Sequence, residues 1–187
     1  MVAKGCLDSK RKFKVSKEIE KHIESENWQG ARKLIRAALR MEPNSHWLIT
    51  RLGLTYYEEH KYKKALVYEE QALALAPHCP LVLWDYAGTL DMLGQTKRAI
   101  NIYKKLVRRG VNKIAYGDCG EGLAWARGLV ADCLYRLANC YEMLGQNKKA
   151  LDYYMQHLSY RGSGCRSIYQ IREVKEQVKM LRLSSVA

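Results

Sequence analysis

The sequence predicts an all-α protein built from stacked helix pairs, and three observations support this fold class. Alanines next to short basic runs recur 34 residues apart, with one longer gap of 51: Ala31, Ala65, Ala99 and Ala150. The phrase DMLGQTKRA at 91–99 returns almost unchanged as EMLGQNKKA at 142–150. The chain has only three prolines, and proline interrupts helices. A fixed period of 34 residues is typical of stacked helix pairs.

The repeated phrase also predicts where the helices end. Gly94 and Gly145 close the first helix of a pair, because glycine readily adopts the left-handed conformation needed there. The polar residues that follow each glycine lead into the second helix. We therefore expect helix pairs at 13–24 and 28–41, 46–59 and 62–75, 80–93 and 96–109, and 121–144 and 147–160.

Large and small residues alternate at fixed places in each repeat. Counted from His46, Pro80 and Ala131, the seventh, eighth and eleventh positions of the repeats are large, small and large. These residues are Leu52, Gly53, Tyr56; Tyr86, Ala87, Leu90; Leu137, Ala138, Tyr141. This pattern resembles the tetratricopeptide repeat family. The resemblance implies a superhelix of four helix pairs plus a C-terminal capping helix, with repeats at 12–45, 46–79, 80–113 and 131–162. The first repeat is degenerate, since Ile19 and His22 stand where small and aromatic residues belong.

The small residues have a physical reason. Two helices can approach to about 8–10 Å only where small side chains meet at their crossing. One pair cannot bury its apolar face alone, so the pairs must stack. Small residues at the crossings and large residues around them are what such an array requires.

Three segments lie outside the repeats. Residues 1–11 are expected to form a flexible basic arm. The insertion at 114–130 contains a stretch with Gly117, Gly120 and Gly122 that we expect to form a flexible loop, after which helical spacing continues into the fourth repeat. The insertion either serves a function or is only tolerated. Residues 163–187 are expected to form the capping helix, on an apolar stripe of Ile168, Ile171, Val174, Val178 and Leu181. A helix that docks on a partner or a second copy is the alternative for this stripe.

The family resemblance implies a binding groove lined by the first helix of each pair. The side chains expected to face it mix aromatic anchors with charged and amide groups, a composition typical of binding sites. They are Trp47, Arg51, Leu54, Tyr57, Trp84, Asp85, Met92, Tyr135, Arg136 and Asn139. We expect a non-catalytic scaffold that binds a peptide or helix of a partner protein. The alternative for Trp47 and Trp84 is that they only fill seams between repeats.

The charge of the chain suggests a second function. Its formal net charge is +13, which attracts anionic partners such as nucleic acid or acidic proteins. The stretch 96–113 carries basic residues and no acid, and its candidate patch is Lys104, Lys105, Arg108 and Arg109. An adaptor for RNA or an acidic partner is therefore the alternative. Aromatic residues that would stack on bases are not interleaved with these charges.

Neither catalysis nor a cofactor is expected. Cys119, in YGDCGEG, has no base placed beside it by the sequence, and its glycines match no phosphate-binding motif. The six cysteines form no metal-binding spacing, so no metal is expected. No stretch is long and apolar enough to span a bilayer, and no export signal is evident. These features predict a cytoplasmic protein with reduced thiols.

Overall fold

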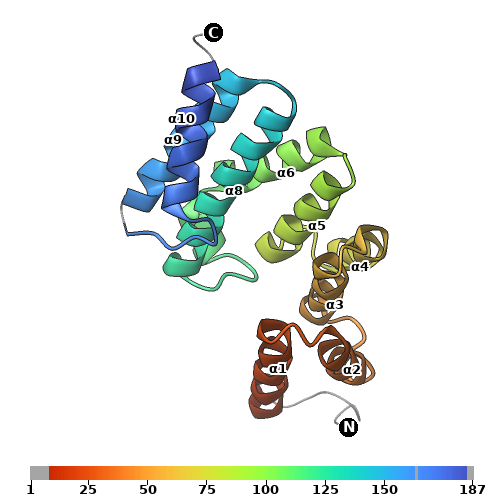
Figure 1. Ribbon diagram of the computed structural model, residues 1–187. Helices are drawn as coiled ribbons and strands as arrows, with labels where there is room; N and C mark the ends of the chain where they lie inside the picture. The colour runs from red at the N-terminus through yellow and green to blue at the C-terminus, as the bar shows by residue number, and fades with distance from the viewer. Residues whose placement is uncertain (1–8, 163, 185–187) are drawn as a thin grey trace. The chain divides into compact units, whose positions relative to one another are not determined.

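A computed structural model describes residues 9–162 and 164–184 of the chain (Figure 1). Within these residues all regular structure is helical. The helices are α1 Ser9–Glu24, α2 Trp28–Leu39, α3 His46–Glu58, α4 Tyr62–Leu75, α5 Pro80–Met92, α6 Thr96–Arg109, α7 Val111–Ala115, α8 Leu123–Met143, α9 Asn147–Gly162 and α10 Ile171–Ser184. The chain divides into two compact units, Met1–Leu93 and Gly94–Ala187. The third predicted pair is split, with α5 in the first unit and α6 in the second.

Left-handed residues form the corners between paired helices. Gly94 and Gly145 have φ values of 76° and 68°, as the repeated phrase predicts. In the first two pairs, Glu26 and His60 adopt φ values of 54° and 58° without glycine. Histidine tolerates this conformation better than most residues, and the His60 ring is held by the Tyr62 hydroxyl at 2.7 Å. The 34-residue period therefore extends to corners that lack its glycine.

Small residues mark the helix crossings in the core. Ala31, Ala65, Ala99 and Ala150 are all fully buried. In the pair α3–α4, a Cβ built on Gly53 would lie 3.5 Å from the carbonyl oxygen of Ala65. Glycine therefore brings the α3 backbone directly against α4, the close approach that the repeat pattern predicts.

The N-terminal helix begins earlier than expected. Residues 1–8 of the predicted basic arm lie outside the described residues, but α1 starts at Ser9, so residues 9–11 are helical. The lysines and arginine here are good helix formers, and their charge does not prevent helix formation. Within the degenerate first repeat, Ile19 is fully buried in a core cluster with Ile35 and Leu48.

The insertion begins within a short helix that the sequence did not predict. Residues 111–115 form the short helix α7, which packs on α8 through the buried Ile114 and Ala115. The Gly122 backbone N–H then donates to the Ala115 carbonyl oxygen at 3.3 Å and closes the loop. Five residues are too few for helical periodicity to show in the sequence. The helix after the loop, α8, is 21 residues long.

The last helix packs against α9. Val174, Val178 and Leu181 of α10 are buried. Ile168 precedes the helix and is 71% exposed, and Ile171 is 37% exposed. The buried part of the apolar stripe is therefore shorter than the sequence suggests, and it begins at Val174.

Overpacking the α3–α4 crossing tests this account of the core. We expect Ala65→Leu to reduce the free energy of unfolding by about 1–3 kcal/mol, because the larger side chain forces α3 and α4 apart. Urea unfolding followed by circular dichroism measures the change. Val67→Leu, on the same helix at a 51% exposed position, is the matched control and should change little. Equal stability of the two variants would contradict the close crossing.

Candidate functional site

The first unit presents seven of the predicted groove residues on two helices. Trp47, Arg51, Leu54 and Tyr57 lie on α3, and Trp84, Asp85 and Met92 lie on α5, which packs against α3. All are half-buried except Met92, which is exposed. We refer to these seven residues as the α3/α5 face. Trp47 also lines an open pocket of about 410 Å³, together with Phe13 and Val15 of α1.

Arg51 is already engaged on this face. Its Nε lies 2.7 Å from Oε1 of Glu20 on α1, and its guanidinium lies 5.4 Å from the centre of the Trp47 ring. The ion pair and the cation–π contact hold Arg51 across α1 and α3. The Trp47 ring therefore lines the pocket and also contacts the Arg51 guanidinium.

Asp85 has unused hydrogen-bonding capacity. Its Oδ2 atom is buried and has no hydrogen-bond partner within the described residues. Burial raises the pKa of Asp85 to about 7, against the lowering effect of Arg51, and Glu58 and Glu20 raise it further. Burial also raises the pKa of Glu58. An unsatisfied buried carboxyl is costly, and a cationic side chain beside it would restore its charged form.

Glu69 of α4 lies close enough to Asp85 for the two carboxyls to interact. It is 1% exposed on α4, and its Oε1 accepts a hydrogen bond from Thr89 Oγ1 at 2.8 Å. Burial, with Asp85 nearby, raises the pKa of Glu69 to about 8. A Cβ on Gly53 would lie 3.1 Å from Glu69 Cγ, so Gly53 also makes room for this carboxyl.

In the second unit the predicted groove residues on α8 already have partners within the unit. Arg136 Nε donates to the Tyr103 hydroxyl at 3.2 Å. Asn139 hydrogen-bonds the Tyr154 hydroxyl, which itself donates to Glu142 Oε2 at 2.9 Å. Buried tyrosines need such partners. Tyr103 and Tyr154 therefore take up the polar ends of Arg136 and Asn139, a pairing that residue type alone does not predict.

Tyr135 is covered by the chain itself. Its ring stacks on Tyr169, with centroids 3.6 Å apart and planes 15° apart. One turn earlier on α8, Asp132 accepts hydrogen bonds from the Ser167 hydroxyl and the Ile168 backbone N–H. The connection between α9 and α10 therefore lies on the α8 face. The sequence did not predict that Tyr169 covers Tyr135.

The basic patch lies on α6. Lys105 and Arg108 are exposed, while Lys104 and Arg109 are half-buried. Lys104 Nζ lies 5.3 Å from the centre of the Tyr141 ring, and Lys149 Nζ lies at the same distance from that ring. Part of the patch is thus used to cover a tyrosine, and Lys105 and Arg108 remain the cations most open to solvent.

The cysteines are mostly buried. Cys79, Cys133, Cys140 and Cys165 are buried, and Cys119 is exposed. Burial raises the pKa of Cys133 and of Cys165, which makes both thiols poor nucleophiles.

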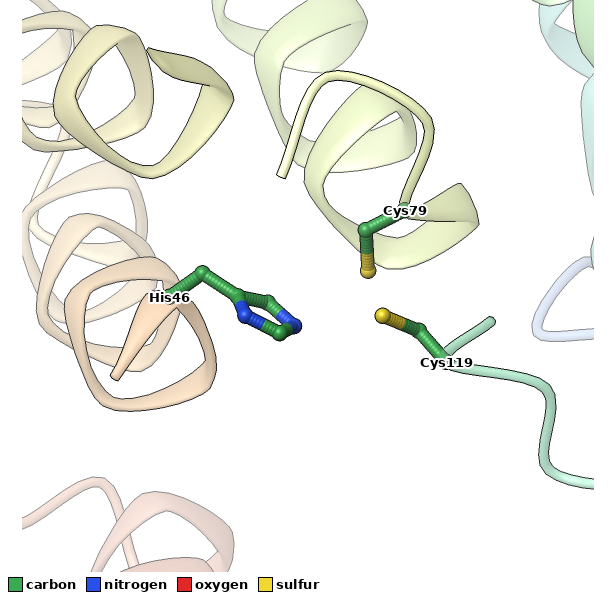
Figure 2. Close-up of side chains that lie close together, drawn as sticks. All are labelled: His46, Cys79 and Cys119. Carbon is green, nitrogen blue, oxygen red and sulfur yellow. The ribbon is translucent and has the colours of Figure 1, made fainter. Parts of the chain in front are cut away.

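Figure 2 shows Cys79 beside His46 in the first unit. A ring nitrogen of His46 lies within 4.8 Å of the Cys79 sulfur. Two ligands are fewer than the three or four protein ligands that zinc takes. Cys119, drawn in the same figure, belongs to the second unit and does not count toward this pair, because the relative positions of the units are not determined.

Two segments of the chain match a known repeat family. Tetratricopeptide repeat profiles match residues 56–118 and residues 132–157. The chain is also 28% identical over 124 residues to anaphase-promoting complex subunit 6 from Arabidopsis thaliana. That match covers 66% of this chain and 21% of the length of the relative.

Solved structures share the fold at low sequence identity. A MamA protein superposes with a TM-score of 0.64 at 16% identity, over 89% of this chain and 78% of that one. MamA from Desulfovibrio magneticus RS-1, from residue 41 onward, gives a TM-score of 0.68 at 13% identity, over 91% of this chain and 83% of that one. These likenesses concern the fold alone.

The chain belongs to the tetratricopeptide repeat family. The predicted all-α fold of tetratricopeptide type is thereby confirmed. Arrays of this kind are protein-interaction scaffolds that offer extended surfaces to partners.

None of the helices in the ranges 9–162 and 164–184 combines the length and apolar character that crossing a membrane requires.

The buried carboxyl of Glu69 generates a pH-dependent prediction. Its pKa is raised on folding from 4.5 to about 8, so it costs no stability below pH 4.5 and costs progressively more as the pH rises toward 8. We expect Glu69→Gln to leave stability nearly unchanged at pH 4.5. The same variant should raise it by on the order of a few kcal/mol at pH 8. Urea unfolding across this range measures the difference.

Glu70→Gln, at the exposed neighbouring position, is the control for that series. An equal gain in both variants, or a gain in Glu69→Gln that does not grow with pH, would show that Glu69 is not the destabilising group.

Proposed function

We propose that the protein is a non-catalytic scaffold that binds a segment of a partner protein on the α3/α5 face. The observation that carries this proposal is the buried, unpaired Oδ2 of Asp85 next to the half-buried Trp84. Hot spots of protein interfaces combine an aromatic anchor with polar groups that a partner must satisfy. The family membership supports the same class of function.

The charges of this face favour a basic segment. The charges of Glu20, Glu58 and Arg51 all act on Asp85, and Arg51 already pairs with Glu20. The face is therefore locally acidic, although the whole chain carries a formal net charge of +13. A lysine or arginine that reaches Asp85, with an apolar neighbour packed against Trp84, satisfies both features. A segment ending in carboxylates would be repelled.

Two further observations fit a scaffold in a larger assembly. The Arabidopsis relative is named as a subunit of the anaphase-promoting complex, and we propose an analogous structural role for this chain among its own partners. None of the five described cysteines forms a disulfide, which agrees with our proposal of a cytoplasmic location.

The basic α6 patch supports the alternative function. Lys105 and Arg108 are exposed, and α6 carries no acidic residue. A nucleic-acid or acidic partner bound there would dissociate steeply with rising salt. We rank it second because the described part of the molecule shows no unsatisfied buried group in this patch.

Affinity purification with quantitative mass spectrometry tests the two surfaces together. We expect Trp84→Ala and Asp85→Asn to lose the same set of partners. Truncating an aromatic anchor costs about 2 kcal/mol or more, roughly 30-fold in affinity. Asp85→Asn keeps the shape of the side chain and removes only its charge, so its effect reports recognition of a cation.

Lys105→Glu combined with Arg108→Glu is the matched control on the other surface, and this double variant should retain those partners. Circular dichroism confirms that each variant stays folded. The reverse pattern, with partners lost only in the α6 variant, would reject the α3/α5 face in favour of the basic surface.

A further inference from the structure

The connection between α9 and α10 follows one face of α8 (Figure 1). Arg166 passes Gly128, Ser167 and Ile168 meet Asp132, and Tyr169 stacks on Tyr135. Gly128, Asp132 and Tyr135 are four and then three residues apart, which puts them on one helical stripe. Residues 165–169, which we name the crossing segment, therefore lie along this stripe.

Gly128 is what lets a backbone lie so close to the helix. A Cβ at this position would be 3.1 Å from the carbonyl oxygen of Arg166, closer than side chains normally tolerate. The crossing segment is also held at its start, where Arg161 Nη1 donates a hydrogen bond to the Cys165 carbonyl oxygen at 2.6 Å. Gly128 of α8 and Arg161 of α9 together hold the extended crossing segment along α8. We call this strip of the α8 surface the track.

The contacts along this track are those of peptide recognition. A buried carboxylate accepts a hydroxyl and a backbone N–H of the crossing segment, and an aromatic ring stacks on another two residues further along. The ring of the fully buried His157 makes edge-to-face contacts with both Tyr135 and Tyr169. These hydrogen bonds and ring contacts can recognise particular side chains of an extended segment without burying a large apolar surface.

The crossing segment is an incomplete ligand for this track. Asp132 is 8% exposed, and its Oδ1 is buried without a hydrogen-bond partner in the described residues. His157 Nε2 is in the same situation. The largest aliphatic side chain of the crossing segment, Ile168, is 71% exposed. The apolar burial of the crossing segment is confined to Cys165 and to the Tyr169 ring. Two buried polar atoms remain for a better ligand.

Release of the crossing segment need not detach the helix that follows it. α10 packs on α9 through its own buried residues Val174, Val178 and Leu181. Gln177 Nε2 also donates to Glu142 Oε1 on α8. The crossing segment is thus fixed at both ends by contacts that do not involve Asp132 or Tyr135.

We propose that the stripe of Gly128, Asp132 and Tyr135 is a second peptide-binding site, occupied in the free protein by the crossing segment. Its partner is an extended protein segment in which a hydroxyl residue is followed two positions later by an aromatic residue. The site is separate from the α3/α5 face and goes beyond the function proposed for that face. Because the crossing segment is tethered, it acts at a millimolar effective concentration. A partner therefore competes with it for the site.

The test uses the full chain and a fluorescein-labelled synthetic peptide of residues 164–170 as the probe, in reducing buffer. Ser167→Ala combined with Tyr169→Ala weakens the internal ligand and leaves the α8 stripe intact. We expect this variant to bind the probe at least about tenfold more tightly than the unmodified chain, by fluorescence anisotropy. Adding Asp132→Asn to it should reverse the gain by about tenfold, because the hydrogen bonds to a charged acceptor are weakened.

Three controls keep the result specific. Ile168→Ala, at an exposed position of the crossing segment, should bind the probe like the unmodified chain. A probe in which Ser and Tyr are replaced by Ala should not bind. Tyr169→Leu, which keeps apolar bulk, replaces the double variant if thermal unfolding shows that the double variant is not folded. No gain in affinity on weakening the crossing segment, or a gain that survives Asp132→Asn, would overturn the proposal.

Discussion

The rest of the structure depends on the close crossing of two helices at a small residue. At the α3–α4 crossing, Gly53 brings one backbone against the carbonyl of Ala65 on the other helix, and the equivalent alanines at 31, 99 and 150 are buried completely. Once the paired helices are this close, the larger side chains around them are directed to the neighbouring pair or to the exposed face. The positions of Trp47, Trp84 and Tyr135 are consequences of this geometry and not independent features.

The two units use the same repeat architecture in opposite ways. On the α3/α5 face of the first unit, a buried carboxyl oxygen of Asp85 is left unsatisfied beside an aromatic residue. On the α8 face of the second unit, the chain supplies its own partner, and Tyr169 covers Tyr135. The difference arises from the connection that follows each helix pair. Residues 76–79 join α4 to α5 directly, whereas the longer connection after α9 is long enough to return along α8.

The charge around the α3/α5 face differs in sign from the net charge of the whole chain. The formal net charge of +13 suggests an anionic partner, yet the α3/α5 face gathers three carboxyl groups around one arginine. Electrostatic interactions are strongest where water is excluded. The half-buried carboxyls of Glu20 and Asp85 therefore matter more to a partner on that face than distant lysines, which solvent and salt screen.

The sequence by itself determined the repeat, because backbone corners and helix crossings tolerate only a few residue types. The period of Ala65 and Ala99 and the glycines at 94 and 145 were enough to place the paired helices to within a few residues. The tertiary structure alone decided which predicted groove residues are open. Arg136 is bound by Tyr103, 33 residues away, and Tyr135 is covered by a residue 34 positions later. The first pairing depends on how α6 and α8 pack, and the second on the path of a connecting segment through space. Neither helical periodicity nor residue type carries a signal for such contacts. The short helix α7 was missed for a related reason, since five residues packed on α8 are stabilised by that contact and not by a pattern of their own.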